Sequence, residues 1–287
     1  MKEKMHSREL GLVLAKRLLD VEDLHYGLWD PSLELKLANL PIAQQRYNEM
    51  LMAQLPEPNG EVRVLDIGCG AGHLLRQLLD RGYRADGVIP ARDLAEAVRG
   101  RLADFPGYRS RLFECRLEDL PLDQCRRHYD VALFSESFQY IPLAASLPRL
   151  QEILKSGGLL VICDFFKTEA LGNGVSGDRS FGGGHPLREF TAAMQRTPFV
   201  AVKDEDITQR VSPNMDLVND VLIHRLKPAV LALGSYLEGR YPLVMRLAMK
   251  LFRRKLEKVN YKYFSGHRSK EVFERYKTYR LLVYRLP

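Results

Sequence analysis

The nine residues Val64–Gly72 constrain this chain more than any other stretch. They read V-L-D-I-G-C-G-A-G, and the residues after them begin a helical pattern of leucines. An apolar run, three glycines in alternate positions and a helix start predict a strand, a tight turn and a helix. Glycine is required where the backbone takes positive φ or lets a ligand approach closely. The turn also points unpaired N–H groups and the positive end of a helix at whatever binds there.

Two phosphate-binding motifs are excluded by the spacing. The dinucleotide fingerprint G-x-G-x-x-G requires a third glycine where this chain has His73, and no G-K-[ST] of a P-loop follows. The stretch instead resembles motif I of the class I S-adenosylmethionine-dependent methyltransferases. Two further segments are similar to that family and stand in the same order, namely E-D-L-P at 118–121 and L-K-S-G-G-L-L-V-I-C-D at 154–164. The tocopherol, sarcosine and cyclopropane-type small-molecule enzymes of the family are the most similar group.

The pattern of apolar runs predicts an α/β fold. Strands are expected at 62–67, 85–89, 113–117, 129–134, 159–166, 199–207 and 278–286, with helices at 74–81, 94–102, 143–154 and 187–195 and a turn at 155–158. The resemblance implies a Rossmann-like, mostly parallel seven-stranded sheet whose last strand is antiparallel. The expected divisions are an N-terminal helical lid (1–55), the cofactor-binding core (56–213), a helical cap insertion over the active site (214–270) and the last strand (271–287).

The resemblance also implies where S-adenosylmethionine, and its product S-adenosylhomocysteine, would bind. The turn would wrap the methionine part, and Asp66 would hold its ammonium. Ile89 stands where most relatives carry the acid that binds the ribose, and Glu118 or Asp119 would meet the adenine amine. The full set of expected cofactor residues is Tyr26, Trp29, Asp66, Gly68, Cys69, Gly70, Gly72, Ile89, Leu117, Glu118, Asp119, Ser135 and Gln139.

Two further segments are candidates for the chemistry. L-H-Y-G-L-W-D-P at 24–31 resembles the stretch that covers the cofactor in the relatives, although a packed hydrophobic turn would read the same way. The second is a glycine-rich loop at 168–186 that ends in G-G-G-H-P. It presents His185 beyond the fifth strand, as the first candidate for a base or an acceptor-positioning group; a plain hydrogen-bonding role is the alternative. Tyr140 and Glu136 follow as catalytic candidates, and then His25 and Tyr26.

Charge and cysteine usage limit the partners. The net charge of +7 is concentrated between residues 240 and 270, which hold ten Lys or Arg and one acid, Glu257. A nucleic-acid partner is therefore not expected. The basic helix at 240–262 is amphipathic, so it would suit an anionic membrane face or, more commonly, a solvated cap surface. The four cysteines lack metal-ligand spacing and the N-terminus lacks a signal sequence. A cytoplasmic protein, with or without peripheral contact to the inner membrane face, is the expectation, with no metal.

Three functions remain open at this stage. The first is transfer of a methyl group to a small, hydrophobic or lipid-like acceptor. The second is a non-catalytic S-adenosylmethionine-binding or membrane-associated accessory protein, and the third is a nicotinamide-dependent oxidoreductase on a similar sheet. The sequence identifies neither the acceptor nor the atom methylated.

Overall fold

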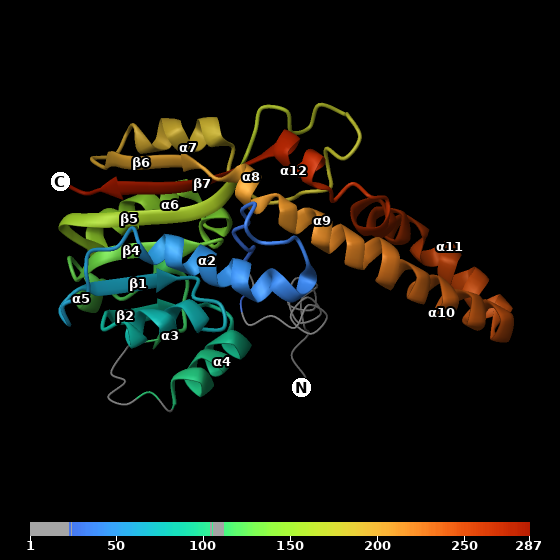
Figure 1. Ribbon diagram of the computed structural model, residues 1–287, viewed down its shortest axis with the longest axis horizontal. Coiled ribbons are helices and arrows are strands. Elements are labelled where there is room, and N and C mark those ends of the chain that lie inside the picture. The colour runs from blue at the N-terminus through green and yellow to red at the C-terminus, as the bar shows by residue number, and fades with distance from the viewer. Residues whose placement is uncertain (1–22, 24, 104, 106–111) are drawn as a thin grey trace.

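A seven-stranded sheet runs through the computed structural model, which describes residues 23, 25–103, 105 and 112–287 (Figure 1). Its strand order is β3-β2-β1-β4-β5-β7-β6. The neighbours from β3 to β5 pair in parallel, and β7 is antiparallel to both β5 and β6. This confirms the expected fold class. The strands are β1 (Arg63–Ile67), β2 (Arg84–Val88), β3 (Leu112–Phe113), β4 (Tyr129–Ser135), β5 (Leu154–Lys167), β6 (Val200–Asp206) and β7 (Lys277–Arg285).

Helices cover both faces of the sheet because successive strand residues point to opposite faces. Val64 and Val131 belong to one core, whereas their neighbours Leu65 and Ala132 belong to the other. The first core packs against α2 (Leu40–Met52), α3 (His73–Asp80), α4 (Arg92–Leu102) and α8 (Thr208–Val211); the second packs against α5 (Leu122–Cys125), α6 (Leu143–Ile153) and α7 (Leu187–Met194). Short 3-10 turns are η1 (Leu37–Asn39), η2 (Leu117–Asp119) and η3 (Phe138–Tyr140).

Two local expectations are corrected. The third strand was expected to reach residue 117, but β3 ends at Phe113 because η2 closes a turn in which Asp119 N–H donates to the Arg116 carbonyl (3.0 Å). Residues 155–158 were expected to be a plain turn. They lie instead in an irregular start of β5, because Gly157 N–H donates to the Leu286 carbonyl (2.7 Å) and keeps the segment paired with the end of the chain.

The segment after β6 is helical, as expected, but most of it does not cover the sheet. Its elements are α9 (Pro213–Asp220), the π-helical η4 (Val221–Leu226), α10 (Lys227–Arg240), α11 (Pro242–Val259), the π-helical η5 (Asn260–Phe264) and α12 (Lys270–Tyr276). The backbone stays helical from 213 to 240, so α10 continues the line of α9 away from the sheet, and α11 folds back on it (Figure 1).

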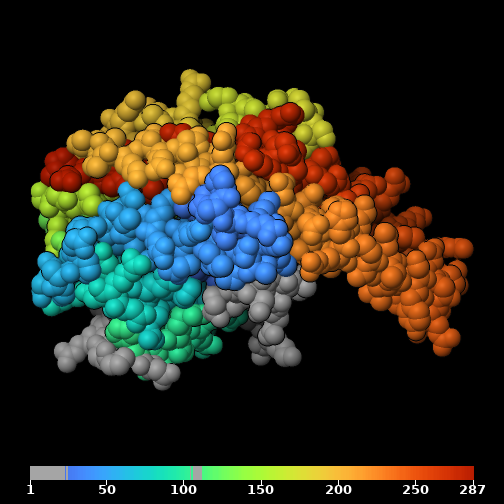
Figure 2. All heavy atoms as spheres, in the orientation of Figure 1, coloured from blue at the N-terminus to red at the C-terminus, as the bar shows by residue number. Residues whose placement is uncertain are grey.

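We call α10 and α11 together the hairpin. Neither helix has a buried residue, and Figure 2 shows the pair as an orange arm projecting from the rounded body. The expectation that this part caps the active site is therefore wrong for α10 and α11, although α9 and α12 do pack on the body through the buried Met215 and Phe273. Within the described residues, no helix is both long and apolar enough to cross a bilayer. The first part of the helical lid expected at 1–55, residues 1–22, lies outside the described residues.

Candidate active site

The glycine turn follows β1 at the carboxyl edge of the sheet, and two of its glycines have different structural reasons. A Cβ on Gly68 would lie 2.4 Å from Cβ of Ser137, so the close approach of η3 requires glycine there. At Gly70 the backbone has φ +55° and a Cβ would meet nothing within 4 Å. Gly68 N–H donates to the Val88 carbonyl (2.8 Å), which fixes the turn on β2. Gly70 therefore presents backbone to open space, as a ligand-binding turn should.

Asp66 is the most unusual side chain of this edge. It is 1% exposed, and its Oδ2 has no hydrogen-bond partner among the described residues. Burial raises the pKa of Asp66 to about 7, and the negative charge of Asp23 adds to this effect. A buried carboxylate without partners costs free energy, which marks a site where a missing group is expected.

A polar cluster that sequence reasoning missed lies beside Asp66. Oδ2 of Asp23 is 2.7 Å from Nδ1 of His73 and 3.3 Å from Nε2 of His25, and it accepts a hydrogen bond from Asn48 (3.0 Å). Burial would raise the pKa of Asp23, but the hydrogen bonds and charges of the two histidines outweigh it and hold the pKa well below its usual range. For His25 the pKa is raised, since Asp23 and Glu136 outweigh the opposing effect of burial.

The stretch 25–29 is fixed across the edge by contacts to three distant elements. Gly27 N–H donates to Oδ1 of Asn214 (2.9 Å), and Trp29 N–H donates to the Arg210 carbonyl (2.8 Å). The Trp29 ring is buried in a small separate cluster with residues of α2. The His25 ring stacks on Tyr47 with 4.4 Å between centroids. The segment, which we call the N-terminal cover, is thus a packed turn beside the edge; that it covers a cofactor, and that Trp29 touches one, remain predictions.

Glu136 connects this cover to the sheet. It follows β4 with φ +53°, a conformation that non-glycine residues rarely adopt. Its Oε1 accepts hydrogen bonds from Tyr26 N–H (2.8 Å) and from the Tyr279 hydroxyl (2.7 Å). Burial raises the pKa of Glu136, against the opposing effects of His25 and of these two donors. Strained backbone of this kind concentrates at functional sites.

The residues next to Glu136 in the chain differ in burial and in hydrogen bonding. The Ser135 hydroxyl is buried without a partner among the described residues, whereas Tyr140 is 63% exposed. Gln139 is held by Asp164, which accepts from its N–H (3.0 Å) and its side-chain amide (3.1 Å). Burial raises the pKa of Asp164 to about 8 despite these bonds. Asp164 ends the L-V-I-C-D segment, but its pairing with Gln139 had no local signal.

His185 is half-buried and lies behind η3. Its Nε2 is 3.2 Å from the Phe138 carbonyl, and its ring meets the Phe138 ring edge to face at 5.5 Å. Phe138 belongs to the second core, whereas the glycine turn, Asp23 and Tyr26 adjoin the first. The structure therefore brings Glu136 and Tyr26 together but holds the His185 ring on a backbone carbonyl.

The expected adenosine residues lie along β2 and η2. Ile89 is buried in the first core, and its N–H donates to the Phe113 carbonyl (3.0 Å). Leu117 is buried, Glu118 is half-buried and Asp119 is exposed. Glu118 is also fixed through its carbonyl, which accepts from Arg149.

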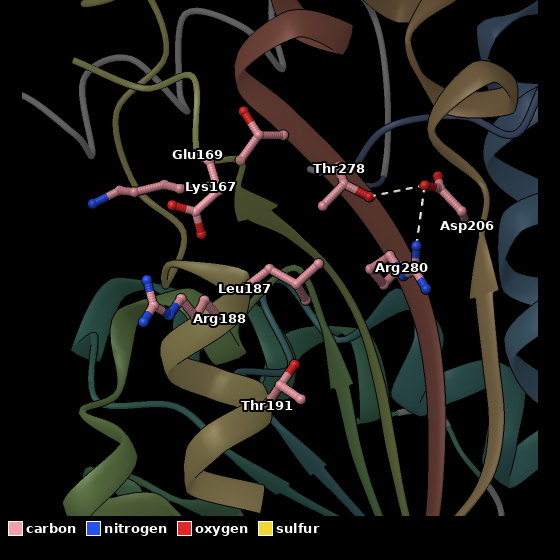
Figure 3. A pocket seen from close by; sticks show the side chains of 9 residues that line it. Lys167, Glu169, Leu187, Arg188, Thr191, Asp206, Thr278 and Arg280 are labelled. Atoms are coloured by element: carbon pink, nitrogen blue, oxygen red, sulfur yellow. Dashed lines mark hydrogen bonds and ion pairs between the residues drawn. The ribbon is translucent and has the colours of Figure 1, made fainter. Parts of the chain in front are cut away.

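A hollow of about 490 Å³ lies elsewhere, between the start of α7 and the edge formed by β6 and β7 (Figure 3). Asp206 accepts there from the Thr278 hydroxyl (3.0 Å) and from Arg280 (3.1 Å). None of the residues that line it belongs to the glycine turn. The hollow is lined by charged residues, of which Asp206 and Arg280 pair with each other, and it is not the site that the motifs indicate. The described residues contain no group of three or more His, Cys, Asp or Glu that could hold a metal ion.

A known protein family matches the region that holds the glycine turn. Residues 65–160 match a family described as "Methyltransferase domain". Sterol 4-C-methyltransferase of Caenorhabditis elegans is 30% identical over 119 residues, which are 41% of this chain and 35% of that enzyme. The chain thus spans about a third of that relative.

Solved structures share the fold over most of the chain. Geranyl diphosphate C-methyltransferase from Streptomyces coelicolor A3(2), solved with S-adenosyl-L-homocysteine, has a TM-score of 0.67 at 19% identity, covering 95% of this chain and 92% of that one. The cyclopropane synthase of Mycobacterium tuberculosis has a TM-score of 0.64 at 15% identity, covering 93% and 95%. In the glycine turn, the strand order and the matched domain, this chain is similar to the class I S-adenosylmethionine-dependent methyltransferases, and it shares their fold.

Proposed function

We propose that the protein transfers a methyl group from S-adenosylmethionine to a small, hydrophobic or lipid-like organic acceptor. One observation carries the cofactor assignment: the buried, unpartnered carboxylate of Asp66 lies directly before a turn whose Gly70 faces open space. An ammonium group is the partner that such a carboxylate lacks, and S-adenosylmethionine carries one. The residues present therefore fit this cofactor.

The cofactor contacts that we propose extend from this point. Asp66 would bind the amine, Gly68–Gly72 would surround the amino-acid part, and η2 with Glu118 or Asp119 would meet the adenine. Ile89 offers no carboxylate to the ribose, so backbone groups of the same edge would hold it. Tyr26 and Trp29 would cover the cofactor, and Ser135 and Gln139 would border it from β4 and η3.

When bound, the cofactor supplies an electrophilic methyl group. The contribution of this chain is then to align the acceptor and exclude water, which can be worth about 7–11 kcal/mol. Glu136 is the group best placed to accept a proton, since its half-buried side chain lies beside the rings of Tyr26 and Tyr279 and burial raises its pKa. His185 would act from behind η3 and Tyr140 from an exposed position, so both rank after Glu136 in this proposal.

Two titrations test the cofactor, and one incubation tests the reaction. Calorimetric titration with S-adenosylhomocysteine is expected to show binding that NADH does not; the reverse result excludes a methyltransferase. Labelled S-adenosylmethionine incubated with a host metabolite extract is expected to yield a labelled small molecule. Cofactor binding without any labelled product favours the accessory-protein alternative.

We also propose that the hairpin contacts an anionic membrane surface. Helix α11 carries six Lys or Arg and one acid, and its apolar residues are exposed as well, with Leu243 at 76% and Leu251 at 74%. Apolar side chains without a packing partner, interleaved with cations, suit the interface of an anionic bilayer. The projecting position of the hairpin would let it reach a lipid surface (Figure 2).

Co-sedimentation with vesicles tests the membrane contact. Wild-type protein is expected to pellet with vesicles that contain phosphatidylserine and to stay in solution with pure phosphatidylcholine. Changing Arg253, Arg254 and Lys258 to Glu should abolish pelleting. The matched control changes three exposed arginines of the body, Arg81, Arg92 and Arg188, and should pellet as the wild type does. Wild-type protein that stays in solution with both vesicles ends this proposal.

A further inference from the structure

Five aromatic rings form a cluster beside Glu136. The Phe165 ring meets Tyr279 at 6.4 Å and Phe273 at 6.1 Å between centroids, and Phe273 also meets Phe181 at 5.2 Å and Tyr26 at 6.3 Å. The rings come from the N-terminal cover, the end of β5, the glycine-rich loop, α12 and β7. We call Tyr26, Phe165, Phe181, Phe273 and Tyr279 the aromatic cluster. Phe181, Phe273 and Tyr279 are buried, whereas Tyr26 and Phe165 are half-buried, so these two rings are the part of the cluster that an acceptor beside Glu136 could contact.

Arg268 lies against this cluster, and its guanidinium has no anionic partner among the described residues. Its guanidinium carbon is 5.0 Å from the Phe181 ring centroid and 5.4 Å from that of Tyr263. Its Nε is buried and has no hydrogen-bond partner, and none of the described carboxylates lies within salt-bridge distance of the side chain. The guanidinium also faces the Tyr26 hydroxyl: burial raises the pKa of Tyr26 to about 12, and the charge and hydrogen bond of Arg268 oppose that rise.

The nearby acids are engaged elsewhere. Glu136 accepts from Tyr26 N–H and from the Tyr279 hydroxyl, and Asp164 accepts from Gln139 and from the Phe165 N–H (2.8 Å). Glu274, six residues beyond Arg268, accepts from the Ser212 hydroxyl (2.6 Å). Arg268 therefore has no neutralising partner of its own within the described part of the chain.

A second buried basic side chain lies against the same cluster. Lys277 is 1% exposed, its Nζ donates to the Gly183 carbonyl (2.6 Å), and it lies 5.1 Å from the Phe165 ring centroid. No described carboxylate is within salt-bridge distance of it. Buried cations are normally paired, and the planar fork of arginine fits carboxylate and phosphate oxygens in particular.

We propose that Arg268 binds an anionic group, a carboxylate or a phosphate, carried by the methyl acceptor. This assignment rests on the proposed methyl transfer at the adjoining edge. The apolar part of the acceptor would pack on the aromatic cluster, and the anionic group would pair with the unpartnered Nε side of Arg268. The acceptor class narrows accordingly from a lipid-like molecule to an amphiphilic acid.

Four aromatic probes test this assignment, by calorimetry with and without S-adenosylhomocysteine. They are phenyl phosphate, phenylacetate, benzyl alcohol and benzylamine, which share a ring and differ in charge. At least one of the two anions is expected to bind wild-type protein about tenfold or more tightly than the alcohol and the amine. The stronger of the two anions identifies phosphate or carboxylate as the group bound.

Variants locate the effect. Arg268→Met should weaken binding of the preferred anion by about tenfold or more, typical for loss of a charge-assisted hydrogen bond, and leave the affinity for benzyl alcohol unchanged. Arg268→Lys should lose only part of the affinity for the preferred anion. The matched control is Arg179→Met, at an 87% exposed side chain of the glycine-rich loop, which should bind as the wild type does.

Several results would overturn the assignment. They are equal affinity of wild-type protein for anions and for benzyl alcohol, preference for benzylamine, or undiminished anion binding in Arg268→Met. If Arg268→Met does not fold, the wild-type comparison and Arg268→Lys decide. Wild-type protein that binds the anion but not S-adenosylhomocysteine would contradict the proposed function and leave the anion site intact.

Discussion

Replacing Asp66 by Asn should stabilise the cofactor-free protein while weakening cofactor binding. The pKa of Asp66 is raised from 3.8 to about 7 by burial and by Asp23. Each pKa unit corresponds to about 1.4 kcal/mol, so keeping this carboxylate ionised in the folded protein costs roughly 4 kcal/mol. Asparagine has nearly the same shape and carries no charge.

The sign of the pH dependence follows from the raised pKa. The folded protein holds the Asp66 proton more tightly than the unfolded chain, so the contribution of this group to stability is fully present below about pH 3.8. This contribution to stability is lost as the pH rises toward 7, and it remains absent above pH 7. Other groups titrate in both proteins, so the difference between variant and wild type isolates Asp66. That difference should approach roughly 4 kcal/mol at pH 8 and shrink toward pH 4.

Urea unfolding at pH 5 and pH 8, without cofactor, measures the first effect. Calorimetry at pH 8 measures the second, in which Asp66→Asn should bind S-adenosylhomocysteine about tenfold to a hundredfold more weakly because a charge-assisted contact is lost. Asp123→Asn, at an exposed position of α5, is the control and should change neither quantity. Equal stability of variant and wild type at pH 8, or equal affinity, would refute this reasoning.

Three further predictions concern the turn, the loop and β7. Gly68→Ala should lower the free energy of unfolding in urea by roughly 2–4 kcal/mol, because the added Cβ would collide with Ser137. Gly70→Ala should lower it by only about 1–2 kcal/mol and chiefly abolish calorimetric binding of S-adenosylhomocysteine. A larger loss of stability in Gly70→Ala than in Gly68→Ala would contradict the assignment of open space at Gly70. His185→Ala should leave that binding intact and slow label transfer, and full activity removes His185 from the mechanism. Lys277→Met should stabilise the protein against urea more below about pH 7 than at pH 10, because burial lowers the pKa of Lys277 to about 7. A stability difference between variant and wild type that is the same at both pH values would be inconsistent with a buried charge.

Local patterns predicted the parts of the fold that local physics determines. The strand-turn-helix around Asp66 follows from periodicity and from a motif whose residues are neighbours in the chain. The antiparallel direction of the last strand was implied only by the resemblance to the family, because an alternating pattern predicts a strand but not its direction. The direction of α10 does not follow from periodicity either, because it depends on unbroken helical backbone from 213 to 240 through a π-helical stretch that no residue type signals. The segment 214–270 is expected from its pattern to pack over the active site as a cap, whereas the structure leaves α10 and α11 exposed.

Some residues of the candidate site could likewise be predicted from local sequence patterns, and others could not. Asp66, Gly70 and Glu136 stand in recognisable segments, and the structure brings Glu136 to Tyr26. The pairs of Asp23 with His73 and of Gln139 with Asp164 join side chains 50 and 25 residues apart, so no local pattern could show them. One signal was available: His73, in the place of a fingerprint glycine, is the residue that ties the N-terminal cover to the start of α3.

Arg268 was counted at the sequence level only as part of a basic stretch. The six Lys and Arg residues of α11 are exposed, whereas the Nε of Arg268 is buried beside Phe181. The difference arises because the chain turns back to the body at Gly266, before α12. Charge counting alone cannot separate a solvated cation from a buried one.

A crystal structure of the protein with S-adenosylhomocysteine tests the central claim most directly. We expect the homocysteine amine within hydrogen-bond distance of the Asp66 carboxylate, with the chain of the ligand along Gly70. Ligand bound in the hollow between α7 and β7, or anywhere that leaves the Asp66 carboxylate without a partner, would contradict this claim.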